Sequence, residues 1–313
     1  MPITPAIQIW RLSDGRAGHD SQSLGLVDAL SRLHPVEALT ITVSNAWHGV
    51  QQVLGKRNRQ PRPEIVIGAG HSTHASLIAG AWRHRARSIV LMNPSFPYAL
   101  FDLCIVPKHD KVQARPNVLQ SVGALNQVQV STRRDPKLAL ILLGGPSRHF
   151  QWQHECVLTQ IRKLLEARAS MHWLIASSPR TPAQMMLALE ALENVQLMRF
   201  EDTPSDWLTA KLVQASLVWV TEDSMSMAYE ALSSGAATGL LQVSTRGTTE
   251  DHARVAGRAT SKLAAAMREL RRSGRIMAME QWLAGTEQGN SMQPLREADR
   301  CARQILERWP DLR

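Results

Sequence analysis

Short apolar runs alternate with amphipathic stretches along the whole of this 313-residue chain, and this alternation most restricts its fold. Runs such as residues 7–12 and 138–143 have the length of buried strands, whereas the stretches between them show the wider spacing of helices. Strands that alternate with helices are typical of parallel sheets covered by helices on both faces. The sequence therefore predicts an α/β protein.

The alternation falls into two successive series, which predicts two doubly wound domains. A chain of 313 residues also exceeds what one hydrophobic core usually supports. The polar segment 131–136 is a plausible linker, so we expect domains over 1–134 and 135–293 and a terminal helix within 294–313. The expected strands lie near 7–12, 38–43, 64–67, 88–92 and 103–106, then 138–143, 172–176, 195–199, 217–220 and 238–242. The expected helices lie near 21–33 and 73–83, then 152–168, 182–192, 205–214, 224–233 and 294–308.

The net charge of +9 indicates an anionic partner. Positive fields attract nucleic acids, anionic membranes and phosphorylated small molecules alike. Only 5% of the residues are aromatic and no RNA- or DNA-binding motif is present, so we expect no nucleic-acid partner. Contact with anionic lipid headgroups stays open, as does simple solvation of the scattered basic clusters.

The three cysteines give no sign of a disulfide framework or a zinc motif. Cys104, Cys156 and Cys301 are far apart and odd in number. The first ten residues lack the pattern of a signal peptide, and no apolar run is long enough to span a bilayer. We therefore expect a cytoplasmic protein, with peripheral attachment to the inner membrane left open.

The loop after the first expected strand is rich in groups that carry chemistry. It contains Asp14, Gly15, Gly18 and His19 ahead of an expected helix. Glycines let a ligand approach the backbone, and free N–H groups at a helix start suit an anion. Because a general base must sit on such a positioned loop, Asp14 and His19 are the candidate catalytic residues. The alternative is that Asp14 and Asp20 only cap the turn and the helix.

The third expected strand leads into a second small-residue loop, in which Gly70 and His71 are candidate binding residues. A helix cap formed by Ser72 or Thr73 would explain part of this loop without a ligand. His71 and His74 have a spacing that could serve a metal, but no carboxylate or cysteine stands beside them. We therefore predict no metal site.

Glycines and basic residues recur where strands of the second series end. Gly144 and Gly145 are followed by Ser147 and Arg148 ahead of an expected helix, a pattern that suits phosphate at a helix N-terminus. The permanent charge of Arg148 could neutralise a departing diphosphate.

The next loop offers a second arginine. Arg180 is a candidate for ligand binding, whereas Thr181 is expected to cap a helix that has Pro182 in its first turn. Thr181 is also a binding candidate.

The most informative stretch begins where the strand near 217–220 ends. Hydroxyl-bearing residues crowd the start of the following helix, and Glu230 lies about two turns into it. Such a helix start can bind diphosphate oxygens, and a carboxylate further along can hold ribose hydroxyls. Met225 and Met227 are more simply explained as core residues. The binding candidates here are Thr221, Asp223, Ser224, Met225, Ser226 and Glu230.

Five fragments of the sequence, taken in order, carry a family resemblance. They are 14–19 with Gln22 and 24–26; 101–102 with 106–110; 144–149 with Trp152; 178–182; and 221–227 with Glu230, Ala231 and Gly235. In these fragments the chain resembles the mitochondrial fission ELM-like family of plants and its bacterial homologues, often labelled nucleoside-diphosphate-sugar epimerases.

The resemblance implies a GT-B-like fold, with two Rossmann-like domains facing a cleft and a terminal helix that packs back on the first domain. The last fragment is similar to the donor-nucleotide segment of GT-B glycosyltransferases, in which a Glu holds the ribose, here Glu230. Where a basic residue and Pro would follow Gly235, this chain has Ala236, Ala237 and Thr238 instead. That departure weakens the expected donor affinity.

The resemblance therefore implies a glycosyltransferase that moves a sugar from a UDP-, GDP- or CMP-sugar to an envelope glycan, such as lipopolysaccharide, or to a lipid-linked acceptor. Asp223, Ser224 and Ser226 would bind the diphosphate, and Arg148 and Arg180 would stabilise it as it leaves, without a metal or other cofactor. Two alternatives stay open. One is an epimerase or hydrolase of nucleotide sugars on the same fold, and the other is a non-catalytic adaptor at membranes.

Overall fold

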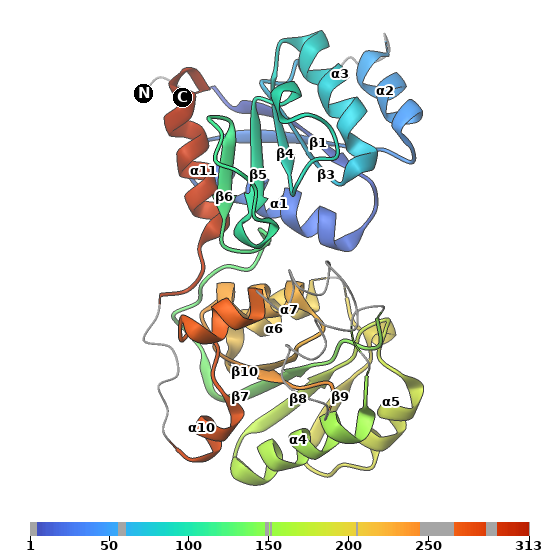
Figure 1. The fold of residues 1–313 in the computed structure, drawn as a ribbon, viewed down its shortest axis with the longest axis vertical. Coiled ribbons are helices and arrows are strands. Elements are labelled where there is room, and N and C mark those ends of the chain that lie inside the picture. The colour runs from blue at the N-terminus through green and yellow to red at the C-terminus, as the bar shows by residue number, and fades with distance from the viewer. Residues whose placement is uncertain are drawn as a thin grey trace. The chain divides into compact units, whose positions relative to one another are not determined.

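The computed structural model describes residues 5–55, 61–147, 150, 152–204, 206–244, 266–285 and 293–312. The chain forms two compact units (Figure 1). Unit 1 consists of Met1–Gln127 and Arg296–Arg313, and unit 2 consists of Val128–Leu295. The expected linker 131–136 therefore belongs to unit 2, where the side chain of Arg134 donates hydrogen bonds to the backbone carbonyls of Ala215 and Ser234.

Unit 1 is built on a six-stranded sheet in the order β2-β1-β3-β4-β5-β6, and every neighbouring pair is parallel. The last strand, at the sheet edge, was not predicted, because it is short and three of its four residues are only partly buried. The strands are β1 (Ile7–Ser13), β2 (Val36–Thr42), β3 (Ile65–Ala69), β4 (Arg87–Leu91), β5 (Leu103–Pro107) and β6 (Val118–Ser121).

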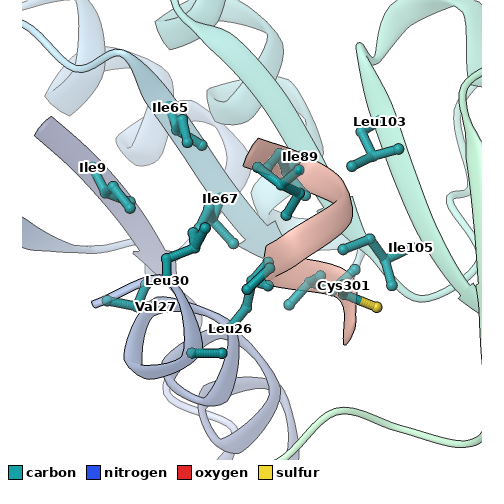
Figure 2. Packing of buried hydrophobic residues seen from close by; sticks show 14 of the residues in the cluster. Ile9, Leu26, Val27, Leu30, Ile65, Ile67, Ile89, Leu103, Ile105 and Cys301 are labelled. Carbon is teal, nitrogen blue, oxygen red and sulfur yellow. The ribbon is translucent and has the colours of Figure 1, made fainter. Parts of the chain in front are cut away.

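Helices cover both faces of this sheet. The helices α1 (Ala17–Ser31) and α11 (Glu297–Arg308) pack on one face, and α2 (Ala46–Leu54) and α3 (His74–His84) pack on the other. Figure 2 shows Leu26, Val27 and Leu30 of α1 and Cys301 of α11 against the isoleucines of the strands. Short 3-10 helices lie at His71–Thr73, Tyr98–Leu100, Lys108–Asp110 and Pro310–Leu312.

The helix α11 is an integral part of unit 1. Ile305 and Leu306 are buried in the same core as α1, and full burial of such a side chain stabilises the fold by about 1.5–3 kcal/mol. Glu297 accepts a hydrogen bond of 2.7 Å from the backbone N–H of Val122, and Arg300 donates one of 2.6 Å to the carbonyl of Gln120. Apolar and polar contacts thus both hold α11 beside β6.

Unit 2 is built on a five-stranded sheet in the order β11-β10-β7-β8-β9, again with parallel pairs. The helices α4 (His154–Ala167), α5 (Ala183–Glu190) and α10 (Met279–Leu283) pack on one face through a common core. The helix α6 (Trp207–Gln214) contacts β7 and β10, and the helix α7 (Met225–Ser234) contacts β10 and β11. The strands are β7 (Asp135–Leu142), β8 (His172–Ala176), β9 (Val195–Met198), β10 (Ala215–Thr221) and β11 (Ala237–Leu241).

The predicted α/β class with two doubly wound parallel sheets is confirmed. Each expected strand and helix is present with ends shifted by a few residues, whereas α2 and α10 were not foreseen. Within the described ranges, no helix combines the length and the apolar character needed to cross a membrane.

Candidate functional site

The candidate residues of unit 1 lie in two loops at one edge of the sheet. One segment follows β1 and has Asp14 in the loop and His19 in the first turn of α1, and the other follows β3 and contains Gly70 and Ser72. Because β1 and β3 are hydrogen-bonded neighbours and parallel, their carboxyl ends bring these loops together.

Asp14 and His19 form a hydrogen-bonded pair. The Nδ1 atom of His19 lies 3.0 Å from Oδ1 and 2.9 Å from Oδ2 of Asp14, and Ser72 donates a hydrogen bond of 2.9 Å to the same carboxylate. Only 6% of the Asp14 side chain and 15% of the His19 side chain are exposed. With an ionised Asp14, Nδ1 is assigned as the protonated nitrogen, which leaves Nε2 as the acceptor.

Hydrogen bonds favour the charged form of Asp14. Burial acts to raise the pKa of Asp14, but the hydrogen bonds from His19, Ser72 and the backbone of Arg16, together with the charge of His19, outweigh it. The pKa of this carboxyl is therefore lowered from its ordinary value of 3.8. An ionised Asp14 is suited to orient the imidazole and to stabilise it once it takes up a proton.

The backbone at Gly70 leaves room for the imidazole. Its φ of 85° lies in the region that favours glycine, and a Cβ at this position would collide with the ring of His19. Gly70 therefore allows the two loops to approach closely. From the sequence we predicted Gly70 only as a ligand-binding residue, whereas the structure gives a packing reason for glycine at this position.

Other candidates of unit 1 do not join this pair. Gly15, Gly18 and His71 are exposed, and no other atom lies close to where a Cβ of Gly15 or Gly18 would be. The expected cap of α3 is wrong, because neither Ser72 nor Thr73 caps it: Ser72 donates to Asp14, and Thr73 donates to the carbonyl of Gly70 at 2.8 Å. In the part of the chain that the structure describes, no group of three or more His, Cys, Asp or Glu side chains is arranged to hold a metal ion.

The candidates of unit 2 lie in the loops that follow β7, β8 and β10, three adjacent strands of the sheet. The glycine pair after β7 joins two of these loops. The N–H of Gly144 donates 2.8 Å to Oγ1 of Thr221, and the N–H of Gly145 donates 3.0 Å to Oδ2 of Asp223. These two N–H groups, which the pattern offered to a phosphate, are thus used within the unit.

Arg180 is fixed by an ion pair with Asp223. Its Nη1 atom lies 2.8 Å from Oδ2 of Asp223 and donates a hydrogen bond of 2.9 Å to the carbonyl of Gly145. The Asp223 side chain is 0% exposed, whereas the Arg180 side chain is 41% exposed. Asp223, which we predicted beside a diphosphate, holds an accessible guanidinium at the carboxyl edge of the sheet.

The glycine pair is required by this close packing. A Cβ at Gly144 would collide with the carboxylate of Asp223, and a Cβ at Gly145 would collide with the backbone carbonyl of Arg180. Larger residues at either position would push apart the loops that carry the ion pair.

The loop after β8 is held by hydroxyl groups. Thr181 donates 2.8 Å to the carbonyl of Gly144 and accepts 2.9 Å from the N–H of Ser178, and Ser178 donates 3.1 Å to the same carbonyl. The expected cap by Thr181 is therefore wrong, since α5 begins after Pro182 without a side-chain cap. Ser178 belongs to one of the five sequence fragments, but its contact with Gly144 was not predicted. Only its hydroxyl group and its position in a loop after a strand could have suggested this contact.

The start of α7 lies directly after this ion pair. Ser224 is the N-cap residue but makes no side-chain capping hydrogen bond, and Ser226 is exposed. Met225, which we expected in the core, is partly exposed, and so are Met227 and Glu230. Arg148 lies outside the described residues, and Ser147 is partly exposed and bridges to Phe150.

Comparison with known structures gives the same fold. A UDP-GlcNAc 2-epimerase from Methanocaldococcus jannaschii covers 97% of this chain and 100% of its own, with 12% identity and a TM-score of 0.54. A UDP-GlcNAc 2-epimerase from Neisseria meningitidis bound to UDP-GlcNAc covers 98% of this chain and 100% of its own, with 10% identity and a TM-score of 0.50. At such identities the likeness shows a common GT-B-like fold. A search of curated proteins found no match.

A family model agrees with the five sequence fragments. The model described as mitochondrial fission ELM1 matches residues 17–309 and so spans nearly the whole chain, including both units. The chain belongs to the mitochondrial fission ELM1 family.

Proposed function

We propose that this protein is a glycosyltransferase that takes a sugar from a nucleotide-sugar donor. The observation that carries the proposal is the accessible guanidinium of Arg180, which the buried Asp223 fixes beside the start of α7. A diphosphate needs positive charge and hydrogen-bond donors, and this arrangement offers both. In this proposal unit 2 binds the donor.

The first turn of α7 supplies the remaining donors. The first N–H groups of any helix have no partner within the helix, and the helix dipole makes this end attractive to anions. Ser224 and Ser226 add hydroxyl groups at the same end, and Glu230, further along α7, is proposed to hold the ribose. The cation and these N–H groups can stabilise a leaving diphosphate without a metal.

Unit 1 is proposed to supply the general base. The Nε2 atom of His19 takes the proton of the acceptor hydroxyl as its oxygen bonds to the anomeric carbon and the bond from that carbon to the diphosphate breaks. Asp14 is the positioning residue, since it holds Nδ1 and stabilises the imidazolium. The acceptor is proposed to be an envelope glycan, such as lipopolysaccharide, or a lipid-linked sugar, reached from the cytoplasmic side.

A thermal-shift screen of UDP-, GDP- and CMP-sugars tests the donor site. A ligand that binds only the folded protein at 100 times its Kd adds about 2.7 kcal/mol to the stability. We expect one nucleotide class to raise the Tm of the wild type and to fail with Arg180→Ala. If no nucleotide or nucleotide sugar stabilises the wild type, the proposal is wrong.

An epimerase or hydrolase of nucleotide sugars is the second candidate. Both of the solved structures described above are named UDP-GlcNAc 2-epimerases, and this favours the alternative. Incubation of the purified protein with the stabilising nucleotide sugar, without an acceptor, distinguishes the two. A glycosyltransferase leaves most of the donor intact, whereas rapid conversion to an epimer or to free sugar would identify the rival reaction.

A further inference from the structure

The helices α2 and α3 of unit 1 lie side by side and run in the same direction (Figure 1). Gly49 of α2 is opposite Ser76 of α3, since a Cβ at Gly49 would collide with the Ser76 side chain. One turn further along both helices, Val53 is opposite Gly80, whose added Cβ would lie 3.4 Å from the Cβ of Val53. These two contacts fix which faces of the pair point outward.

On α3, the residues just after the contact positions, Leu77 and Ala81, are buried. The residues just before them, Ala75 and Ala79, are therefore on the outer side and are partly exposed. Because the two parallel helices face each other, the outer side of α2 carries the residues that follow its contact positions. The outer residues of α2 are Val50 and Leu54, so both helices present apolar side chains on one surface.

Two tryptophans extend this surface. Trp47 precedes Val50 by three positions on α2 and is 72% exposed, and Trp82 follows Ala79 by three on α3 and is 81% exposed. Leu54 is 41% exposed. Tryptophan side chains with such large exposed fractions are unusual, and a group of exposed apolar residues marks an interaction site. We call Trp47, Val50, Leu54, Ala75, Ala79 and Trp82 the apolar face.

The charge around the apolar face is positive. Between residues 38 and 101 the sequence contains one carboxylate, Glu64, and neither α2 nor α3 carries an acidic residue. Arg83 in the last turn of α3 and Arg85 at its C-cap are exposed, and so is Arg62, which lies between α2 and β3 in the sequence. The basic residues in this part of the sequence are Lys56, Arg57, Arg59, Arg62, Arg83, Arg85 and Arg87.

We propose that the apolar face docks on the surface of a membrane that contains anionic lipids. Tryptophan is suited to the boundary between headgroups and acyl chains, and each nearby arginine adds attraction to anionic lipid. A second copy of this chain fits less well, because a two-fold contact would bring like charges together. A nucleic acid offers no apolar surface for the aliphatic residues. The inference is independent of the proposed reaction.

Vesicle co-sedimentation tests the proposal with the full chain. The wild type is expected to bind vesicles of phosphatidylcholine and phosphatidylglycerol, to bind pure phosphatidylcholine weakly, and to lose binding as salt screens the charges. The double variant Trp47→Ser/Trp82→Ser should bind at least ~10-fold more weakly, and Arg83→Glu about 5-fold more weakly. Leu187→Ser is a matched control, since Leu187 is 68% exposed on α5 in unit 2.

Fluorescence gives a second readout that reports on the tryptophans themselves. Vesicles with brominated acyl chains should quench part of the wild-type emission, and the double variant should lose that quenching. Its thermal unfolding should match the wild type, because both side chains are exposed. Equal vesicle binding by the double variant and the wild type would overturn the proposal, as would a dimer that the double variant converts to a monomer, or loss of binding to a nucleic acid instead of to vesicles.

Discussion

The guanidinium of Arg180 and the carboxylate of Asp223 approach to 2.8 Å, and the acid is the buried member of the pair. In Asp223→Asn the arginine loses the charge that holds it, and the N–H of Gly145 loses a charged acceptor. We expect the affinity for a stabilising nucleotide to fall about tenfold and the free energy of unfolding to fall by about 1–3 kcal/mol. Calorimetric titration and urea unfolding measure these effects.

The ion pair between Arg199 and Glu190 is a suitable control for that prediction. Both of its side chains are nearly half exposed, so Glu190→Gln should change stability by at most about 1 kcal/mol and leave nucleotide binding unchanged. Equal effects of the two variants would contradict a special role for Asp223.

A positive charge at position 180 should not by itself be sufficient for tight binding of the nucleotide. One guanidinium nitrogen contacts both the carboxylate of Asp223 and the carbonyl of Gly145, which a flexible ammonium group cannot do with the same geometry. Arg180→Lys should therefore bind the nucleotide more weakly than the wild type and more tightly than Arg180→Ala. The order of the three Kd values is the measurement, and Lys binding as tightly as Arg would refute it.

The pair of Asp14 and His19 should affect turnover more than donor binding. His19→Gln removes the proposed base, so we expect kcat to fall about 10²–10⁴-fold with the Kd of the donor unchanged. Asp14→Asn should have a smaller effect and should alter the pH dependence of kcat, because it no longer selects the Nδ1–H form of the imidazole. Steady-state kinetics over pH, with the donor from the thermal-shift screen, check this.

Gly70→Ala should be damaging for two reasons. Its φ of 85° is unfavourable for alanine, and the added methyl group would collide with the ring of His19. We expect a loss of about 1–3 kcal/mol and a fall in kcat that follows displacement of the imidazole. Gly18→Ala is the matched control, because no atom stands in the way there, and it should be close to neutral in both measurements.

Glu297 should make the stability of the protein depend on pH. Burial raises its pKa, but Arg300, the N–H of Val122 and the charge of Lys108 together lower it from 4.5. A lowered folded-state pKa means that the contribution of Glu297 is complete well above pH 4.5 and is lost as pH falls through the lower value.

The variant Glu297→Gln should therefore be less stable than the wild type by about 1–3 kcal/mol at neutral pH, and the difference should shrink below pH 4.5. Denaturant unfolding at several pH values measures it. Glu307→Gln, at an exposed position of the same helix, is the matched control and should leave the stability at neutral pH close to that of the wild type.

Much of the fold could be predicted because burial leaves a strong pattern in the sequence. Buried parallel strands such as β3 and β5 read as continuous apolar runs, and the order of strands and helices follows from them. The elements that were missed have weak patterns. The helix α2 is only nine residues long and buries only Gly49 and Val53, and β6 has four residues and is largely half exposed, so both patterns are too short to stand out.

The sequence predicted which residues belong to the candidate site better than it predicted what each of them contacts. The loops that carry Asp14, Arg180 and Asp223 could be identified because polar residues follow apolar strands. The partners could not, because the contact of Ser72 with Asp14 and that of Arg180 with Asp223 join loops far apart in the sequence. A capping pattern and a long-range hydrogen bond use the same residue types, so the sequence favoured the local interpretation for Ser72 and Thr181.

The position of α11 has a consequence for how the chain matures on the ribosome. Cys301, Ala302, Ile305 and Leu306 complete the core of unit 1, yet all of unit 2 is synthesised before them. Until α11 is synthesised, α1 alone covers its face of the first sheet, and the part of that face beneath α11 stays open. A nascent chain stalled before residue 296 would therefore expose the apolar surface that α11 covers, and is the form that chaperones and proteases would meet.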